Sequence, residues 1–242
     1  MTYFELIGWA KETLYENKNS DITQESFYLL TEIFNQSKAK ILANLNGPIK
    51  NKVKINRFKK ATLRRLEGEP IAYIIKKTEF MGNQYECQKG VFIPRPETEV
   101  LIQSVSEWVK KNKLKKGLFL EFGSGTGIVS IELAKRLNNW QGLSWDLNKK
   151  ATTLSKKNAA KMKIKNVRWV NQNFFDQVND IEKKISKYQN VILVANPPYI
   201  DISDTEYLDA NVKEFEPHDA LFANNQGLEC IQRLLNLAQK WQ

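Results

Sequence analysis

The sequence predicts an α/β fold in which a parallel sheet follows a small all-helical domain. Short apolar runs near residues 118, 143, 167 and 191 alternate with helical patterns, as expected for parallel strands joined by crossover helices. A glycine-rich turn follows the first of these runs. The first 80 residues carry helical periodicity instead. These three observations divide the chain into two domains, for which its 242 residues provide enough length.

The first domain is predicted to consist of helices. Apolar residues recur at helical spacing between residues 4 and 14 and again between residues 27 and 34, with Asp21 as the N-cap of the second helix. A further helix runs through residues 58–63 and ends at a Gly-Glu-Pro stretch. Residues 81–100 hold two glycines and two prolines, which predict a hairpin and a rigid connection to the second domain.

A basic run lies within the helical domain. Eight lysines and arginines fall between residues 50 and 65, beside an apolar helical face. Clustered cations of this kind can neutralise phosphates of a nucleic acid. A solvated helix face in a lysine-rich chain explains the same pattern, and we favour that interpretation. Direct nucleic-acid binding is therefore not expected.

The glycine-rich turn predicts a cofactor site. It joins the apolar run at residues 118–122 to the helical pattern of residues 128–137, and alternate glycines let a ligand approach the backbone where a Cβ would collide. The spacing G-x-G-x-G differs from that of dinucleotide sites and favours S-adenosylmethionine. We expect Glu121 to face the ammonium group of that cofactor, through its charge or through water. The turn residues are Gly123, Ser124, Gly125, Thr126 and Gly127.

Two further strand ends are predicted to complete the cofactor site. Asp146 ends the second strand about 20 residues after the last glycine, where an acid can accept hydrogen bonds from both ribose hydroxyls. After the third strand, Asn173 is expected to meet the exocyclic amine of adenine and Phe174 its ring face. We assign Phe175 to the core. The alternative is that both phenylalanines are core residues.

The fourth strand ends in Asn196-Pro197-Pro198-Tyr199, which predicts the chemistry. Two prolines remove two N–H donors and stiffen the chain, so carbonyl oxygens stay free to accept. Asn196 Oδ1 and the Pro197 carbonyl can accept both hydrogens of an amide or exocyclic amine and favour the positive charge that grows on a nitrogen during methylation. We assign all four residues to substrate binding, Asn196 also to the cofactor site, and Asn196, Pro197 and Tyr199 to catalysis. The alternative is a plain strand-to-loop turn, because Asn-Pro often opens turns.

Together these motifs resemble those of the peptide chain release factor glutamine methyltransferases, the PrmC or HemK family. The resemblance also includes residues 68–74, residues 93–99 and the stretch Phe215-Glu216-Pro217, so it covers nearly the whole chain. Asn-Pro-Pro-Tyr is shared with amino-methyltransferases of DNA and RNA. The Pro-Arg-Pro-Glu-Thr-Glu stretch at residues 94–99 discriminates better.

The resemblance implies a Rossmann-like class I S-adenosylmethionine-dependent methyltransferase domain at residues 101–242. It makes residues 1–80 the substrate-recognition domain and residues 81–100 the hairpin and linker. The implied reaction is N5-methylation of the glutamine side chain in the Gly-Gly-Gln motif of peptide chain release factors. Residues implied to line the cofactor site are Glu121, Gly123, Gly125, Asp146 and Asn173. The family more often has an aspartate at position 173, so the missing charge is expected to alter cofactor affinity.

The resemblance also predicts an incomplete sheet. The family continues after the helix expected near residues 228–235 with a Gly-Gly turn and further strands, whereas this sequence stops at Gln242. We therefore expect a C-terminally truncated domain whose Asn196-bearing strand lies at an open, apolar edge, unless a missing C-terminal fragment completes it. Two alternative functions stay open: a truncated, inactive cofactor-binding protein, and a DNA or RNA amino-methyltransferase, for which no target-recognition module is evident.

The composition of the chain narrows the classes of protein to which it can belong. The chain carries a net charge of +10 and has two cysteines, Cys87 and Cys230, without paired metal-ligand spacing, so we expect no metal site and a reducing compartment. Its one histidine, His218, is assigned to a surface loop. No apolar stretch is long enough for a membrane span, and the first residues do not form a signal peptide. We therefore expect a cytoplasmic location.

Overall fold

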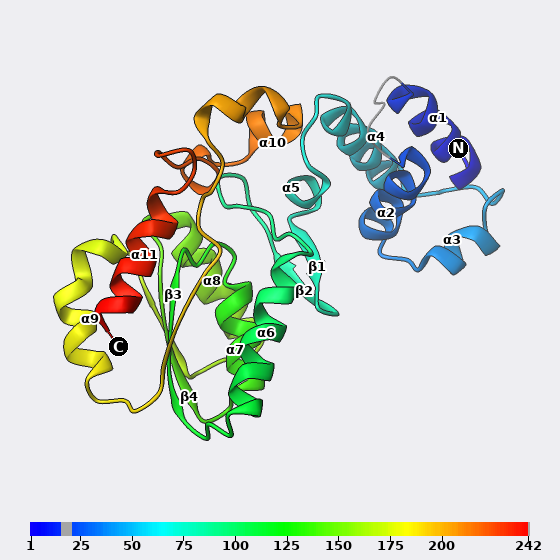
Figure 1. Cartoon of the computed structure of the whole chain (residues 1–242). Helices are drawn as coiled ribbons and strands as arrows, with labels where there is room; N and C mark the ends of the chain where they lie inside the picture. Colours follow the sequence, from blue (N-terminus) through cyan, green and yellow to red (C-terminus); the bar gives the residue numbers. More distant parts are fainter. Residues whose placement is uncertain (16–20, 242) are drawn as a thin grey trace. The chain divides into compact units, whose positions relative to one another are not determined.

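The structure is a computed structural model of the chain and describes residues 1–15 and 21–241 (Figure 1). The chain forms two compact units, Met1–Lys76 and Lys77–Gln242. The sequence analysis placed the boundary at residue 80. The structure places it earlier because the antiparallel hairpin of β1 (Lys77–Phe80) and β2 (Asn83–Glu86) packs Phe80 and Tyr85 into the core of the second unit.

The first unit is a cluster of short helices around an aliphatic and aromatic core. Leu6, Leu29 and Phe58 are fully buried and bring three of its helices together. Asp21 accepts the Gln24 N–H at 3.1 Å, which confirms the predicted N-cap. The helices are α1 (Tyr3–Leu14), α2 (Ile22–Phe34), α3 (Lys38–Ala43), α4 (Lys52–Leu66) and α5 (Ile71–Ile75). Helices α3 and α5 span only six and five residues, too few for a helical pattern to predict them from the sequence.

The basic run lies mostly on α4, and its members differ in environment. Arg57 and Lys60 are exposed, as expected for a solvated face. Arg65 is only 5% exposed, and its guanidinium donates two hydrogen bonds to Glu25 at 2.9 and 3.1 Å. This residue therefore joins α4 to α2 and does not belong to the solvated face.

The second unit contains the predicted parallel sheet. Its strands are β3 (Gly117–Phe122), β4 (Trp140–Trp145), β5 (Val167–Val170) and β6 (Val191–Ala195). They lie in the order β5-β4-β3-β6, and each neighbouring pair is parallel. The four strands occur where the sequence predicted them. The clearest signal is that of β3, which has a strand on each side, is buried along most of its length and reads as a nearly continuous apolar stretch.

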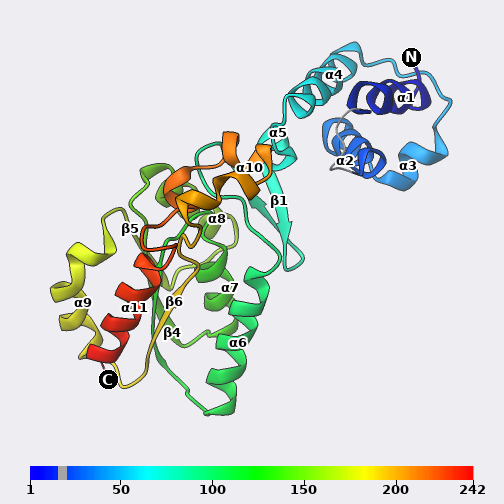
Figure 2. The same ribbon diagram turned by 45° about the horizontal axis from the view of Figure 1, so that its top comes forward.

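Helices cover both faces of the sheet (Figures 1 and 2). Phe119 points into one core layer with side chains of α6 (Thr98–Lys111), α7 (Ile128–Arg136) and α8 (Lys149–Lys161). Leu118 and Leu120 point into the opposite layer, because side chains alternate along a strand. That layer is covered by α9 (Val178–Ile185) and α11 (Glu229–Lys240), which lie side by side. Lys240 Nζ lies 2.7 Å from Glu182 Oε1 and links these two helices.

The strand that carries the Asn-Pro-Pro-Tyr motif is an edge strand in the described part of the chain. β6 pairs with β3 only, from Leu118↔Val191 to Phe122↔Ala195. Its side chains nevertheless contribute to both core layers, with Val194 in one and Leu193 in the other. The prediction of an open edge is therefore confirmed for the described residues, while the faces of β6 are partly covered.

Two further findings concern the cysteines and the length of the apolar helices. Cys87 is buried, Cys230 is half-buried, and both are free thiols. Within residues 1–15 and 21–241, no helix has the length and apolar character that crossing a bilayer requires.

Gly142 tests how tightly the first core layer is packed. A Cβ added at this position in β4 would lie 2.3 Å from Phe119 Cζ. We expect Gly142→Ala to lower the free energy of unfolding of the second unit by about 1 to 3 kcal/mol, because overpacking forces neighbouring side chains to shift. Urea unfolding followed by tryptophan fluorescence measures this change.

The matched control is Gln141→Ala, at an exposed position on the same strand. It is expected to change the free energy of unfolding by less than about 0.5 kcal/mol. Equal stability of the Gly142→Ala variant and the unmodified chain would contradict the packing argument.

Candidate active site

A cavity of about 430 Å³ lies at the carboxyl ends of the strands. The chain runs from β3 to β4 and β5 in one direction and then returns to place β6 on the other side of β3. Ligands of open α/β sheets bind where the strand order reverses in this way. Loops that follow β3 and β6 therefore face each other across the crevice, and the cavity size is within the range of small-molecule sites.

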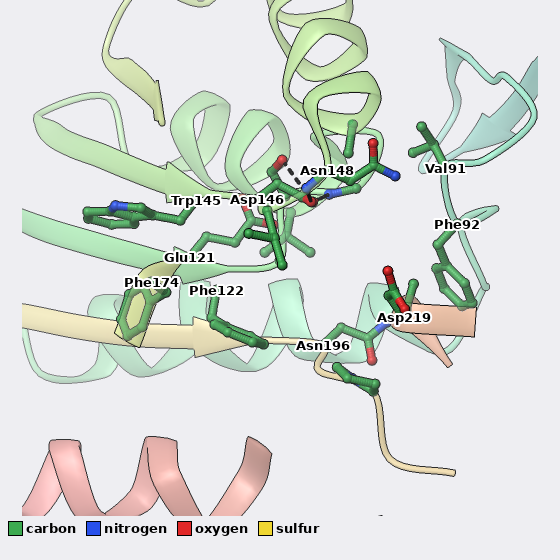
Figure 3. A pocket seen from close by; sticks show the side chains of 18 of the residues that line it. Val91, Phe92, Glu121, Phe122, Trp145, Asp146, Asn148, Phe174, Asn196 and Asp219 are labelled. Carbon is green, nitrogen blue, oxygen red and sulfur yellow. Dashed lines mark hydrogen bonds between the residues drawn. The ribbon is translucent and has the colours of Figure 1, made fainter. Parts of the chain in front are cut away.

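Most of the predicted site residues line this cavity. They are Glu121, Gly123, Ser124, Gly125, Thr126, Asp146, Asn173, Phe174, Asn196 and Pro198. Three predicted residues, Gly127, Pro197 and Tyr199, are not among the lining residues. Figure 3 shows Glu121, Asp146 and Asn196 around the cavity, with Trp145 and Phe174 at one end.

The three glycines of the turn have different roles. Gly123 and Gly125 have φ values of 78° and 51°, and no atom lies within 4 Å of an added Cβ at either position. Both therefore supply the left-handed backbone and leave free space at the cavity. Gly127 precedes α7 and also has a left-handed φ, of 88°, but an added Cβ there would lie 3.0 Å from Ser155 and 3.1 Å from the Trp169 ring. Its absent side chain serves packing, which explains its position outside the lining.

Asp146 is held rigidly at the end of β4. Its Oδ2 accepts the Gly125 N–H at 2.8 Å and the Ser124 hydroxyl at 3.3 Å, and its Oδ1 accepts the Asn148 N–H at 2.8 Å. Burial raises the pKa of this carboxyl, while the hydrogen bonds counteract the shift. The turn and the aspartate therefore fix each other, with the carboxylate set against the cavity.

Glu121 lies in an environment that the sequence analysis did not anticipate. It is 1% exposed, and its Oε2 accepts the hydroxyls of Ser130 and Ser144, the latter at 2.5 Å. Burial raises the pKa of Glu121 to about 8 against the opposing effect of both hydroxyls. Burial therefore favours the neutral form of this carboxyl, while the two hydroxyls favour the charged form, and the expected contact with an ammonium group stays a prediction.

The segment after β5 also differs in detail from the prediction. Asn173 lines the cavity, but its Oδ1 accepts the Phe175 N–H at 3.1 Å and caps the short helix η1 (Phe174–Gln177). One lone pair of that oxygen stays free for a ligand. Phe174 is 2% exposed and packs edge-on against Trp145, so it is mainly a core residue.

Phe175, which we had assigned to the core, is half-buried and also lines the cavity. The guanidinium carbon of Arg233, on α11, lies 3.7 Å from the centre of its ring. An alternating burial pattern does not distinguish two adjacent aromatic residues in a short helix that follows a strand. This local geometry explains why Phe174 is more buried than Phe175.

Asn196 lies at the end of β6 with its amide oriented. Its Nδ2 donates to Thr98 Oγ1 at 3.4 Å, and none of the described residues donates a hydrogen bond to its Oδ1.

Tyr199 is 62% exposed, so its ring is open to solvent. The Ile200 N–H donates to the Leu221 carbonyl at 3.0 Å. A Cβ at Gly227 would lie 2.1 Å from the Tyr199 carbonyl oxygen, so this glycine is required for the path of the loop.

The segment before α6 contributes lining residues that sequence reasoning missed. Phe92, Pro94 and Thr98 line the cavity, and Figure 3 shows Phe92 on the same side as Asp219. Asp219 belongs to the short helix η3 (His218–Ala220), in which His218 is exposed as predicted. The signal for this contribution was present, since residues 93–99 and 215–217 carried the family resemblance, but it did not indicate a position at the cavity.

A salt bridge joins these two segments. Arg95 donates to Glu216 Oε1, and the Ile93 N–H donates to Glu216 Oε2 at 3.1 Å. The Glu216 side chain is only 1% exposed, and the Arg95 guanidinium also lies 4.8 Å from the centre of the Phe92 ring. The Arg95 side chain is half-buried, and its bond to the buried Glu216 carboxylate joins two chain segments that are 121 residues apart in sequence.

The fold and the cavity define a class I S-adenosylmethionine-dependent methyltransferase. Two known families match the sequence: the PrmC N-terminal domain over residues 5–75 and the Methyltransferase small domain over residues 95–214. A solved structure, the SAM-dependent methyltransferase from Agrobacterium tumefaciens, is 21% identical and covers 50% of this chain and 39% of its own, with a TM-score of 0.41.

Sequence relatives are more informative. The chain is 31% identical over 255 residues to the release factor glutamine methyltransferase of Pasteurella multocida (strain Pm70), which covers 98% of this chain and 83% of that protein. The protein of the same name from Haemophilus influenzae is 32% identical, with coverages of 96% and 78%. The one from Mycoplasma mycoides subsp. mycoides SC is 30% identical, with coverages of 99% and 80%. The chain belongs to the release factor glutamine methyltransferase family.

The buried Glu121 predicts a pH-dependent stability. Its pKa rises from the ordinary 4.5 to about 8 on folding, so between these pH values the folded chain holds a proton that the unfolded chain releases. Its contribution therefore makes the protein less stable as pH rises through this window, by at most about 1.4 kcal/mol per pH unit. We expect Glu121→Gln to lose this slope, so that the variant gains stability relative to the unmodified chain as pH rises.

Urea unfolding at several pH values between about 4.5 and 8 measures the difference between the two proteins. Glu107→Gln, at an exposed position on α6, is the control and should give a difference that does not vary with pH. A pH-independent difference for Glu121→Gln would show that this carboxyl is ionised in the folded protein.

Proposed function

We propose that this chain transfers a methyl group from S-adenosylmethionine to the side-chain nitrogen of the glutamine in the Gly-Gly-Gln motif of peptide chain release factors. One observation supports the chemistry above all. Asn196 presents an unoccupied Oδ1 at a cavity built around a glycine turn, while its Nδ2 is held by Thr98. Membership of the release factor glutamine methyltransferase family supports the choice of substrate.

The residues of the cavity fit the cofactor. Gly123 and Gly125 leave space where a side chain would intrude, which suits the methionine portion of the molecule. Asp146 has its carboxylate fixed against the cavity and can accept hydrogen bonds from ribose hydroxyls. Asn173 and Phe175 offer a polar edge and a ring face for adenine. When bound, S-adenosylmethionine supplies an electrophilic methyl group on a sulfonium.

The substrate carboxamide needs orientation more than it needs a base. Its nitrogen is a weak nucleophile because its lone pair is delocalised into the carbonyl group. Asn196 Oδ1 and the Pro197 carbonyl oxygen would each accept a hydrogen bond from one N–H of the substrate amide and so fix the plane of that amide. The same two oxygens favour positive charge as it develops on the nitrogen. The methylated nitrogen is acidic and loses its proton readily.

Tyr199 and Pro198 would hold the rest of the glutamine. The Tyr199 ring is 62% exposed, so it is accessible to a protein loop that approaches the cavity. Pro198 lines the cavity beside Asn196. A rigid backbone at this point reduces the entropy that ordering the substrate would cost.

We assign substrate recognition to the first unit, residues 1–76, which matches the PrmC N-terminal domain. Its exposed cations, including Arg57 and Lys60, increase the rate of encounter with acidic surfaces and do not require a nucleic acid. Release factors act in translation, so this function goes with a cytoplasmic location.

Asn196→Ala tests the proposal. It removes the acceptor that orients the amide, and we expect kcat to fall by about 100- to 1000-fold. Methylation is measured with S-adenosylmethionine and a release factor, followed by mass spectrometry of the peptide that contains Gly-Gly-Gln. Asn190→Ala is the control, because that residue donates to the Lys116 carbonyl at the opposite end of the sheet.

Two results would count against the proposed function. One is an unmodified chain that binds S-adenosylmethionine in calorimetry but leaves the release factor glutamine unmethylated. The other is methyl incorporation into DNA or RNA under the same conditions, which would favour an amino-methyltransferase of nucleic acid.

A further inference from the structure

We propose that Thr98 is a positioning residue for the methyl transfer, because it fixes the amide of Asn196 in the orientation that the substrate needs. This inference rests on the proposed function. Thr98 is the first residue of α6, is 6% exposed and lines the same cavity as Asn196. Its hydroxyl is the hydrogen-bond partner of Asn196 Nδ2 among the described residues.

Asn196 needs such an anchor because its own side chain is exposed. It lies just past the end of β6, which among the described residues has a strand neighbour on one side only. A free amide could also turn over and present its NH₂ group to the substrate NH₂, so that a donor would face a donor. The contact with Thr98 occupies Nδ2 and leaves Oδ1 for the substrate. At 3.4 Å it is long for a hydrogen bond, so a small movement of either side chain would break it.

Thr98 is itself held in place by the salt bridge described above. The Thr98 N–H donates to the Arg95 carbonyl at 3.1 Å and closes a turn before α6. Arg95 is bound to the buried Glu216, which also accepts the Ile93 N–H. The position of the Thr98 hydroxyl is therefore set by contacts that reach from residue 93 to residue 216. A fixed hydroxyl can fix an exposed amide, whereas a mobile one cannot.

The variants Thr98→Val and Thr98→Ser separate positioning from packing. Valine keeps the volume and removes the hydroxyl, whereas serine keeps the hydroxyl and loses only a methyl group. We expect Thr98→Val to lower kcat by about 10- to 100-fold, the scale of a small misplacement of a reacting group. The Kd for S-adenosylmethionine in calorimetry should stay within about twofold, and Thr98→Ser should keep kcat within about threefold of the unmodified chain.

Thr153→Val is the matched control. Thr153 lies on α8 in the second unit, is not among the residues that line the cavity, and its hydroxyl donates to the Lys149 carbonyl at 2.8 Å. This variant loses a threonine hydroxyl away from the site and should leave kcat unchanged. An unchanged kcat in Thr98→Val, or an equal loss in Thr98→Ser, would overturn the inference.

A spectroscopic measurement tests the contact without turnover. In ¹⁵N-labelled protein, the side-chain NH₂ signals of Asn196, identified by their loss in Asn196→Ala, should shift and exchange faster with water in Thr98→Val than in Thr98→Ser. Unchanged signals in Thr98→Val would refute the anchoring role even if the unmodified chain does not methylate a release factor. An inactive unmodified chain with shifted signals would instead refute the proposed substrate and retain the anchor.

Discussion

The parallel pairing of β3 with both β4 and β6 is the constraint on which the site depends. Phe122 at the end of β3 is in register with Trp145 on one side and with Ala195 on the other. The residues that follow these strand ends must then lie along one edge of the sheet, although they are separated by many residues in sequence. The glycine turn, Asp146 and Asn196 meet around one cavity for this reason.

A second constraint comes from the salt bridge between Arg95 and Glu216. Burying a carboxylate costs free energy that an ion pair offsets only when its geometry is good, so such a pair specifies an arrangement more than it adds stability. Glu216 meets that condition by accepting from the Arg95 guanidinium and from the Ile93 N–H. The effect is to hold the segment before α6 against the segment after α10 (Ala210–Phe215), where both line the cavity.

The sequence predicted the parts of the site that local pattern determines. Apolar runs located the four strands, and the residues that end them, such as Asp146 and Asn196, followed from chain direction. Contacts between segments that are distant in sequence leave no periodic pattern in the sequence. The hydrogen bond between Thr98 and Asn196 could therefore not be predicted, although Thr98 lies in a stretch that carries the family resemblance. The shift in the pKa of Glu121 could not be predicted from the sequence either. It depends on the burial of the carboxyl and on two serine hydroxyls, which only the folded chain brings together.

The charges around the cavity explain how a basic protein can suit a cationic cofactor. The chain carries a net charge of +10, yet the lining holds the carboxylates of Asp146 and Asp219 against the single cation of Arg233. The guanidinium of Arg233 lies over the Phe175 ring, and its Nη1 lies 3.7 Å from Glu229 Oε1. The positive charge of Arg233 is therefore partly balanced by the Glu229 carboxylate. At an ionic strength of about 0.1 M, interactions between exposed charges are screened within about 10 Å, so distant lysines of the outer surface have little effect on the potential inside the cavity. The local excess of carboxylates would therefore set the field that a bound sulfonium meets.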